Sequence, residues 1–181
     1  MKKESTFAYV LRLTVTLLLI TGIVAIALAG VNMVTAPAIA ELNAQKTQAA
    51  IELVLPGGGE ATDFPETALV SKVYAGDAGY AVEVTPGGFD NTITMMVGVD
   101  KAGTVLGISI IKHTETAGLG AVAAAGTPAG EAFRAEFVGA TGSVSVTKDG
   151  GTVDSITGAT ITSRAVCAGV NAALECVAKM G

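Results

Sequence analysis

The sequence has 181 residues, enough for one modest domain with a membrane anchor. Half of the residues are hydrophobic and the mean hydropathy is +0.58, which is too high for an ordinary soluble domain. Only 4% of residues are aromatic, Trp is absent and no basic patch occurs, so the composition argues against nucleic-acid binding. From Glu41 onward, eight basic residues face fifteen acidic ones, which gives this part a net charge of −7.

The N-terminal apolar segment predicts a membrane helix. Residues 10–31 are almost all apolar, and about twenty such residues span a bilayer. A cleaved signal peptide is the alternative, with Ala36-Pro37-Ala38 as its cleavage site, but the apolar run is too long for that role. Lys2, Lys3 and Arg12 lie before or just inside the run, so the positive-inside rule places the N-terminus in the cytoplasm. We therefore expect a cytoplasmic N-terminus at residues 1–9, a transmembrane helix at residues 10–34 and an extracytoplasmic domain at residues 35–181.

Helix and strand signals follow the anchor. Pro37 is typical of a first helical turn and predicts that a second helix starts near residue 35 and ends at residues 56–59, which are Pro and Gly. A polar loop is expected at residues 60–66. Strands are expected at residues 68–75, 80–85, 92–99 and 104–112. The high Val, Ile and Met content of the last two predicts a central, covered hairpin.

Residues 113–120 (His-Thr-Glu-Thr-Ala-Gly-Leu-Gly) leave this hairpin as a loop with the only histidine of the sequence, His113. A lone histidine is usually a structural residue with its hydrogen bonds satisfied. No partner residues lie at metal-ligand spacing, so we expect no metal site. No nucleophile accompanies His113 for acid–base catalysis. Gly118 and Gly120 allow the backbone to approach something flat or anionic.

The C-terminal part predicts further helices. We expect helices at residues 128–137 and 161–180, and a hairpin formed by residues 143–147 and 152–156. Cys167 and Cys176 are nine residues apart in the final helix, which is too far for a disulfide, and they resemble small core hydrophobes. The order of elements predicts an α+β fold in which helices pack on a mainly antiparallel sheet.

The junction before the final helix gathers Ser and Thr side chains at residues 154–163. The first N–H groups of a helix have no intrahelical partner, and the helix dipole adds partial positive charge there. Such a junction favours an anion, above all a phosphate. The alternative is an ordinary helix cap, since Ser and Thr are good capping residues.

Two motifs carry a resemblance to a known family. Residues 154–160 (Asp-Ser-Ile-Thr-Gly-Ala-Thr) match the D-x-x-[ST]-G-A-T signature of covalently flavinylated proteins. Residues 113–120 resemble the H-x-E-T-P-G-L-G loop of the same FMN-binding domains, with Ala117 in place of the usual Pro. The chain resembles the G subunits of Rnf complexes, which are membrane ferredoxin:NAD oxidoreductases. The C subunit of the sodium-pumping NADH:quinone reductase is a close relative of that family.

The resemblance implies a covalent FMN that is joined through its phosphate to Thr160 by a separate flavin transferase. It also implies a role for Asp154 in recognition during flavin transfer. The implied contacts of the flavin and its phosphate are Thr157, Gly158, Ala159, Glu115, Thr116, Gly118 and Leu119. Lys148 and Phe89 are further candidates, as a cation for the phosphate and a ring beside the isoalloxazine, unless they are plain surface or core residues.

By this resemblance the protein is an electron-transfer subunit outside the cytoplasm, in a cell-membrane complex that couples electron flow from ferredoxin to NAD with sodium or proton translocation. Its expected partners are the other Rnf subunits, the flavin transferase and the lipid bilayer; this chain alone has no complete active site. The alternatives are the covalent-FMN subunit of a sodium-translocating NADH:quinone reductase, a stand-alone flavin reductase, and a non-redox membrane-anchored module whose Ser/Thr cluster is only a cap.

Overall fold

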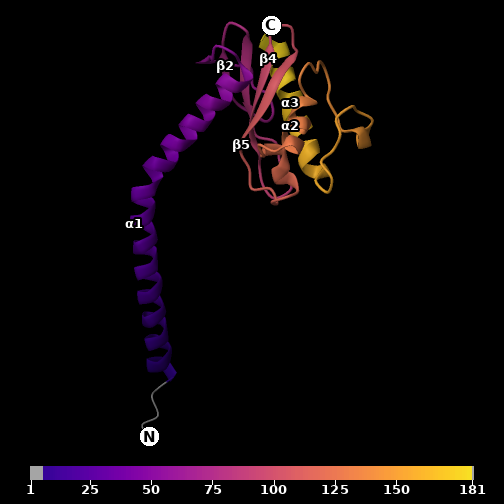
Figure 1. Ribbon diagram of the computed structural model, residues 1–181. Coiled ribbons are helices and arrows are strands. Elements are labelled where there is room, and N and C mark those ends of the chain that lie inside the picture. The colour runs from indigo at the N-terminus through magenta and orange to yellow at the C-terminus, as the bar shows by residue number, and fades with distance from the viewer. Residues whose placement is uncertain (1–5, 181) are drawn as a thin grey trace. The chain divides into compact units, whose positions relative to one another are not determined.

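The computed structural model describes residues 6–180, and the chain divides into two units, Met1–Ala44 and Gln45–Gly181. The first unit consists of most of helix α1 (Thr6–Val54), which is long and apolar enough to cross a membrane (Figure 1). The prediction of a helix restart near Pro37 is wrong, because α1 continues through that residue. Proline cannot donate a bond to the carbonyl four residues earlier, but one missing bond kinks a helix without having to end it.

The second unit is built on a five-stranded antiparallel sheet in the order β1-β2-β3-β4-β5, so that each strand pairs with the next along the chain (Figure 1). The strands are β1 (Glu60–Thr62), β2 (Val70–Ala75), β3 (Gly79–Val84), β4 (Thr94–Asp100) and β5 (Val105–Lys112). The predicted polar loop at residues 60–66 is partly wrong, because its first three residues pair with β2 as an edge strand. The α+β fold with a mainly antiparallel sheet is confirmed.

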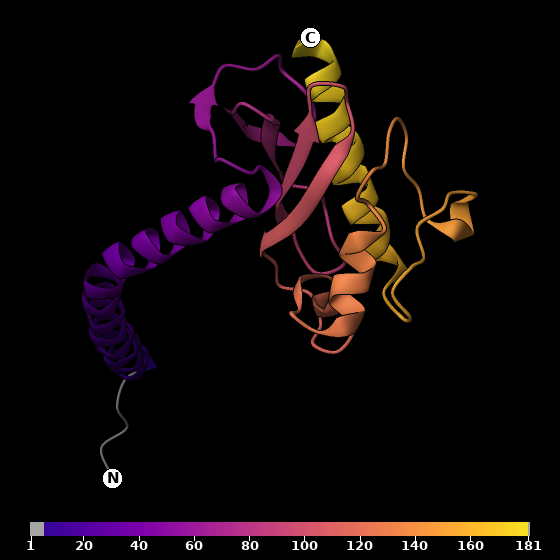
Figure 2. The same ribbon diagram turned by 45° about the horizontal axis from the view of Figure 1, so that its top comes forward.

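Helices cover both faces of the sheet. Helix α3 (Thr160–Met180) packs on one face, where Val84, Met95 and Val97 share a core with Val166 and Val170 (Figure 2). The last turns of α1 cover the other face. There Gly98 of β4 lies so close to α1 that an added Cβ would clash with the carbonyl oxygen of Val54.

The hairpin of β4 and β5 is only half central. Strand β4 is buried along nearly its whole length, as predicted. Strand β5 is the last strand of the sheet, and its first residue, Val105, bonds outward to the backbone of Gly139 and Ala140. These bonds occupy part of an edge that would otherwise be open.

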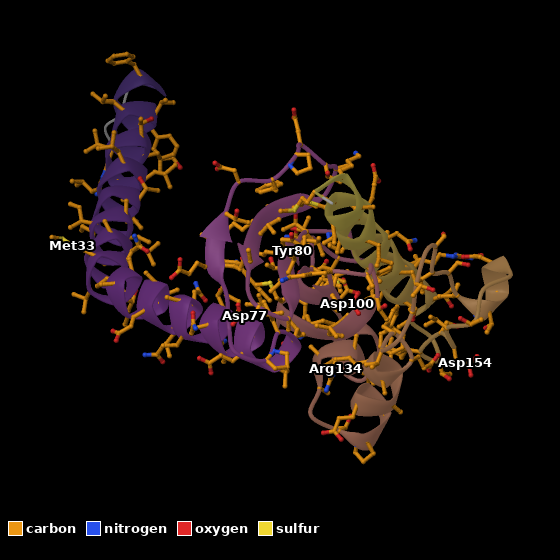
Figure 3. The ribbon with its side chains drawn as sticks, turned by 90° about the horizontal axis from the view of Figure 1, so that it is seen from above. Met33, Asp77, Tyr80, Asp100, Arg134 and Asp154 are labelled. Carbon is orange, nitrogen blue, oxygen red and sulfur yellow. The ribbon has the colours of Figure 1, made fainter. Side chains whose placement is uncertain are left out.

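Short helices follow β5 along the chain. They are the 3₁₀ helix η1 (Gly120–Ala124), helix α2 (Pro128–Ala135) and the 3₁₀ helix η2 (Thr147–Asp149). Arg134 of α2, labelled in Figure 3, donates to the carbonyl oxygens of Ala123 at 2.7 Å and Ala125 at 3.0 Å, and so fastens η1 to α2. Phe133 packs edge to face on Phe137 with 5.3 Å between ring centroids, and both rings are buried in the core.

The predicted hairpin of residues 143–156 is wrong. Val146 and Val153 form an isolated parallel bridge, and η2 lies in the loop between them. The loop is closed at its base, where Thr147 N–H donates to Val153 O at 2.8 Å and Gly151 N–H donates to Val146 O at 3.1 Å. Gly150 has a φ of +84°, which turns the chain back and which glycine adopts without strain. The structure therefore has a short loop, closed at its base by hydrogen bonds, where the pattern predicted two strands.

Candidate functional site

The N-terminus of α3 presents free backbone donors. Thr160 is the first helical residue, and Gly158 just before it has a φ of +76°, a left-handed conformation that favours glycine. Within residues 6–180, no side-chain oxygen accepts a hydrogen bond from the N–H groups of Thr160, Ile161 or Thr162. The first turn thus keeps the positive potential of an uncapped helix end.

A cavity of about 300 Å³ opens at this helix end. It is lined by the turn after β3, the loop after β5, the tip of η2 and the first turn of α3. The lining residues are Phe89, Glu115, Thr116, Leu119, Gly120, Lys148, Gly158, Ala159, Thr160, Ile161 and Thr162. Segments that lie far apart in the sequence, such as those of Phe89 and Thr160, therefore meet at this helix end.

Thr160 has a cation beside its hydroxyl. The ammonium of Lys148 donates to Thr160 Oγ1 at 2.9 Å. The next residue, Asp149, accepts two 2.7 Å bonds from the guanidinium of Arg164, one helical turn beyond Thr160. These bonds lower the pKa of Asp149 below its ordinary value, chiefly because Arg164 hydrogen-bonds to it.

Other hydroxyls near Thr160 are already engaged. Thr162 is buried and donates to Glu115 Oε2 through its Oγ1. Ser163 is also buried; its Oγ donates to Ala159 O at 3.1 Å and accepts from Ile156 N–H at 3.0 Å. Thr160, which is only partly buried and faces the cavity, is the hydroxyl of this turn that stays accessible.

Glu115 joins three segments inside the cavity wall. Its Oε1 accepts from the N–H groups of Phe89 at 2.9 Å and Asp90 at 3.4 Å, and its Oε2 accepts from Thr162. A Cβ added at Gly88 or Gly120 would clash with the Glu115 carboxylate. The sequence suggested Glu115 only as a flavin contact. It could not reveal that Glu115 holds these segments together, because the hydrogen-bond partners are 25 to 47 residues away along the chain.

Apolar side chains stand at the mouth of the cavity. Phe89, Leu119 and Ile161 are 66%, 42% and 49% exposed although all three line the cavity. Leu119 lies against Gly158, since a Cβ added there would come within 3.0 Å of its side chain. Exposed large apolar residues that converge on one opening are typical of a ligand site. Together with the cation and free N–H groups, they fit a ligand with an anionic end and a flat apolar end.

Two implied flavin contacts, Gly118 and Thr157, and the residue implied in flavin transfer, Asp154, do not line this cavity. Gly118, Thr157 and Asp154 line a neighbouring groove of about 350 Å³ between α2 and the segment before α3. Asp154 is exposed, and its backbone N–H donates to the carboxylate of Glu136 (Figure 3). The sequence interpretation also missed Gly120, Ile161 and Thr162 as cavity residues. The helical position of Ile161 and Thr162, directly after Thr160, was the available signal.

His113 is not part of the cavity lining. It is half-buried, and its Nδ1 is buried without a hydrogen-bond partner in the described part of the chain. The expectation of a structural histidine with satisfied hydrogen bonds is therefore wrong in this respect.

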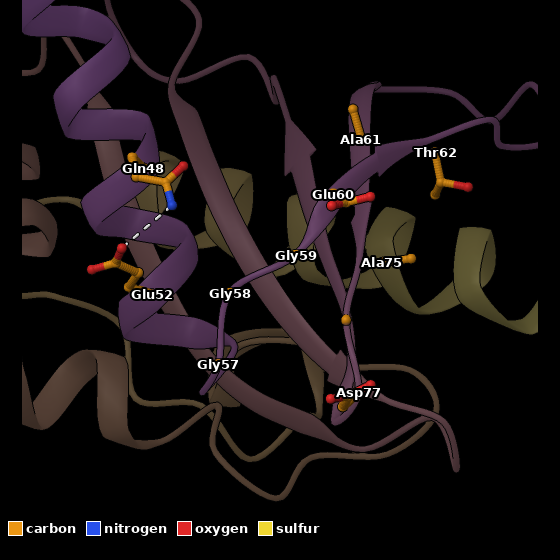
Figure 4. Close-up of a pocket in the computed structure, with 11 residues that line it drawn as sticks. Gln48, Glu52, Gly57, Gly58, Gly59, Glu60, Ala61, Thr62, Ala75 and Asp77 are labelled. Atoms are coloured by element: carbon orange, nitrogen blue, oxygen red, sulfur yellow. Dashed lines mark hydrogen bonds between the residues drawn. The ribbon is translucent and has the colours of Figure 1, made fainter.

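A larger hollow lies beside the glycine-rich segment after α1 (Figure 4). It measures about 1040 Å³ and is lined by residues 57–62 and 75–77, with Gln48 and Glu52 of α1. Gln48 donates to Glu52 at 3.3 Å, and Figure 4 shows Glu60 and Asp77 apart from that pair. No group of three or more His, Cys, Asp or Glu residues in the described ranges is arranged to hold a metal ion. This cleft offers polar backbone and carboxylates without a cation.

The two cysteines belong to the core. Cys167 and Cys176 are free and buried in α3. Burial raises the pKa of the Cys167 thiol to about 11 and raises that of Cys176 as well. Both thiols are therefore poor nucleophiles at neutral pH.

Comparison with known proteins first defines the class. Residues 88–175 match the model of the FMN-binding domain, a range that includes every residue lining the cavity. The chain therefore contains an FMN-binding domain, and the cavity lies within the matched range.

Full-length relatives define the family. The chain is 34% identical to the G subunit of the Na⁺-translocating ferredoxin:NAD⁺ oxidoreductase complex of Acetobacterium woodii, over 96% of this chain and 94% of the relative. It is 32% identical to the G subunit of the proton-translocating complex of that name from Clostridium ljungdahlii, over 96% and 92%. The G subunit of the ion-translocating oxidoreductase complex of Methanosarcina acetivorans is 39% identical over 55% and 51%. The chain belongs to the family of G subunits of ion-translocating oxidoreductase complexes, which confirms the resemblance seen in its motifs.

Proposed function

We propose that this protein is a membrane-anchored electron-transfer subunit whose FMN is covalently attached to Thr160 through the FMN phosphate. The observation that carries the proposal is the geometry at the start of α3. An accessible Thr160 hydroxyl lies 2.9 Å from the Lys148 ammonium, beside the uncapped helix N-terminus and inside the cavity. These are the groups that a phosphate ester needs around it, since both the ammonium and the helix end favour negative charge.

The donor set also fits the rest of the cofactor. Phe89, Leu119 and Ile161 supply apolar contacts for the flat ring system, and Thr116 and the loop backbone supply hydrogen-bonding groups. The small Ala159 and the glycine at residue 158 leave the approach to Thr160 open. Bound FMN supplies electron transfer between neighbouring redox centres, and the chain's own residues hold it and set its surroundings.

Attachment needs a flavin transferase that uses FAD. In this step Thr160 Oγ forms a bond to the phosphorus of the FMN half, the P–O–P anhydride bond of FAD breaks, AMP leaves, and the hydroxyl proton passes to a base. The Lys148 ammonium donates to Thr160 Oγ1, so the hydroxyl's own proton is free to leave. We assign Asp154 to recognition by the transferase, because it is exposed and lies outside the cavity that receives the flavin.

The apolar helix and the relatives support a proposal for where the protein works. We infer that α1 crosses the membrane with residues 10–34, that residues 1–9 are cytoplasmic and that the FMN domain lies outside the cytoplasm, because the basic residues precede the apolar run. Within the complex, the protein passes electrons on the route from ferredoxin to NAD that the names of its relatives state. The complex couples this flow to sodium or proton translocation.

The acceptor is tested by Thr160→Ala in the full-length chain co-expressed with a flavin transferase. We expect a folded protein without the flavin fluorescence that wild type keeps in a denaturing gel. Thr141→Ala is the matched control, since Thr141 is exposed and lies outside the cavity lining. Covalent fluorescence in Thr160→Ala would overturn the attachment site, and its absence from wild type would overturn covalent FMN altogether.

A further inference from the structure

We propose that the ion pair between Asp149 and Arg164 is a positioning device that holds the Lys148 ammonium against the Thr160 hydroxyl, and that flavin attachment depends on it. The proposal rests on the attachment of FMN at Thr160. It extends the site to two residues that neither line the cavity nor belong to the two sequence motifs.

The ion pair links two adjacent residues of η2, Lys148 and Asp149, to one face of α3. Arg164 Nε and Nη2 each lie 2.7 Å from an oxygen of the Asp149 carboxylate, a bidentate arrangement that fixes distance and orientation together. Arg164 is four residues after Thr160 and so shares its helix face. Asp149 directly follows Lys148 on η2. The pair therefore sets the separation between the backbone that carries the lysine and the backbone that carries the threonine.

The loop is anchored to α3 before η2, where Val144 exchanges hydrogen bonds with Asn171 and Val146 is buried in the core. Beyond this anchor, the hydrogen bonds that hold η2 itself against α3 are few. The bonds of Thr147 N–H and Gly151 N–H close the base of the loop on itself. In the described part of the chain, the hydrogen bonds from η2 to α3 are those of Lys148 with Thr160 and of Asp149 with Arg164. A lysine ammonium on four flexible carbons does not hold one position alone, whereas an arginine fork on a carboxylate does.

A purely stabilising role does not account for the pair. Its side chains are 51% and 39% exposed, and exposed ion pairs contribute little to stability. Helix α3 carries a second exposed pair, Lys179 with Glu175 at 2.6 Å, which lies near the other end of the helix and lines no part of the FMN cavity. Both are exposed ion pairs, but Lys179 and Glu175 lie four residues apart on one helix, whereas Asp149 and Arg164 join η2 to the helix turn beside Thr160.

The attachment step makes the dependence explicit. As Thr160 Oγ bonds to phosphorus and the anhydride of FAD breaks to release AMP, negative charge develops on the phosphoryl oxygens. The Lys148 ammonium must stay within hydrogen-bond distance of Oγ to stabilise this charge, while the hydroxyl proton passes to a base of the flavin transferase. If the ion pair between Asp149 and Arg164 breaks, Lys148 keeps its charge but is no longer held beside the Thr160 hydroxyl.

The experiment measures the initial rate of covalent flavin incorporation in purified full-length protein, with FAD and a flavin transferase. We expect Asp149→Asn and Arg164→Gln to lower the rate at least tenfold, to about the rate of Lys148→Met. Because the three residues act as a unit, combining Arg164→Gln with Lys148→Met should slow it little further. The charge exchange Asp149→Arg with Arg164→Asp should recover a large part of the rate. Glu175→Gln, which breaks the other pair of α3, should match wild type.

The outcomes separate this proposal from the one it rests on. Wild-type rates in Asp149→Asn and Arg164→Gln would overturn the positioning role while leaving Thr160 as the acceptor. Slow incorporation without recovery in the charge exchange would also overturn it, because the pair would then be ordinary support of the fold. An equal loss of rate in Glu175→Gln would also overturn the positioning role, because the effect would then come from net charge alone. Absence of covalent flavin from wild type would remove the proposed function and this inference together.

Discussion

The cavity at the start of α3 and the cleft beside residues 57–62 differ in what faces them. The cleft is more than three times larger, at about 1040 Å³ against about 300 Å³, yet its side-chain charges are the carboxylates of Glu52, Glu60 and Asp77. The cavity combines a lysine, free helix N–H groups and three exposed apolar side chains. An anionic cofactor with a flat ring fits the smaller hollow, because convergent donors and apolar walls define a site more than volume does.

The cleft is the better place to test topology, because no proposed function depends on it. We expect Ala61→Cys in the intact chain to react almost completely with a membrane-impermeant maleimide added to cells without an outer barrier. Ala61 is exposed in the cleft, and the native thiols give little background because they are buried and their pKa values are raised.

Ser5→Cys is the control for the opposite side of the membrane. It should react only after the membrane is opened, since residues 1–9 are proposed to be cytoplasmic. Labelling of residue 5 with protection of residue 61 in intact cells would reverse the proposed orientation.

Of the two adjacent glycines Gly87 and Gly88, only Gly88 packs against the cavity wall. A Cβ at Gly88 would clash with Glu115 and approach the backbone oxygen of Asn91 to 2.8 Å, whereas a Cβ at Gly87 would meet nothing within 4 Å. We expect Gly88→Ala to lower the free energy of unfolding by about 1–3 kcal/mol and to reduce flavin loading severely. Gly87→Ala should leave both unchanged. Denaturant unfolding and in-gel fluorescence measure the two effects, and equal behaviour of the two variants would mean that the wall adapts.

The adjacent residues Glu115 and Thr116 contribute differently to stability. Glu115→Ala leaves the N–H of Phe89 and the hydroxyl of Thr162 without their acceptor, which should cost about 1–3 kcal/mol of stability. Thr116 is exposed, so Thr116→Ala should change stability by less than about 0.5 kcal/mol. We expect both variants to shift the flavin potential or to lower flavin loading. Redox titration of the loaded proteins measures the first effect, and in-gel fluorescence measures the second. Unchanged potential and loading in Thr116→Ala would remove that residue from the flavin contacts.

The sequence predicted what depends on local pattern. Strands β2 to β5 and helices α2 and α3 have clear periodic or strand-forming residues, and their positions are close to those expected. The loop of residues 143–156 was misread because Val and Thr favour strands, while the observed loop is set by Gly150 and by bonds at its base. Strand β1 was missed because three polar residues at an edge carry no apolar alternation.

The site was predictable where a motif runs along the chain and not where contacts cross it. Thr160 and Lys148 were both candidates, but twelve residues separate them and only the fold puts them 2.9 Å apart. The pairing of Asp149 with Arg164 and the threefold role of Glu115 have no local signature at all. Thr157, by contrast, belongs to the signature yet lines the neighbouring groove, just before the left-handed turn at Gly158.

The smallest expected effect concerns the acid dependence of the pair beside the cavity. Arg164 lowers the pKa of Asp149, so Arg164→Gln should raise that pKa towards its ordinary value. A carboxyl group with a depressed folded-state pKa stabilises the fold above its unfolded-state pKa, and this contribution is lost as the pH falls through the folded-state pKa. The difference in Tm between wild type and Arg164→Gln should therefore be present at neutral pH and shrink as the pH falls below the ordinary range of carboxyl pKa values. Because both side chains are largely exposed, the difference should be small even at neutral pH. Thermal unfolding across this pH range measures it, and combining Asp149→Asn with Arg164→Gln should add little further loss near neutral pH. A difference that persists undiminished in acid would mean that Arg164 stabilises the start of α3 by packing, and a large one would make the pair a structural element like Glu115.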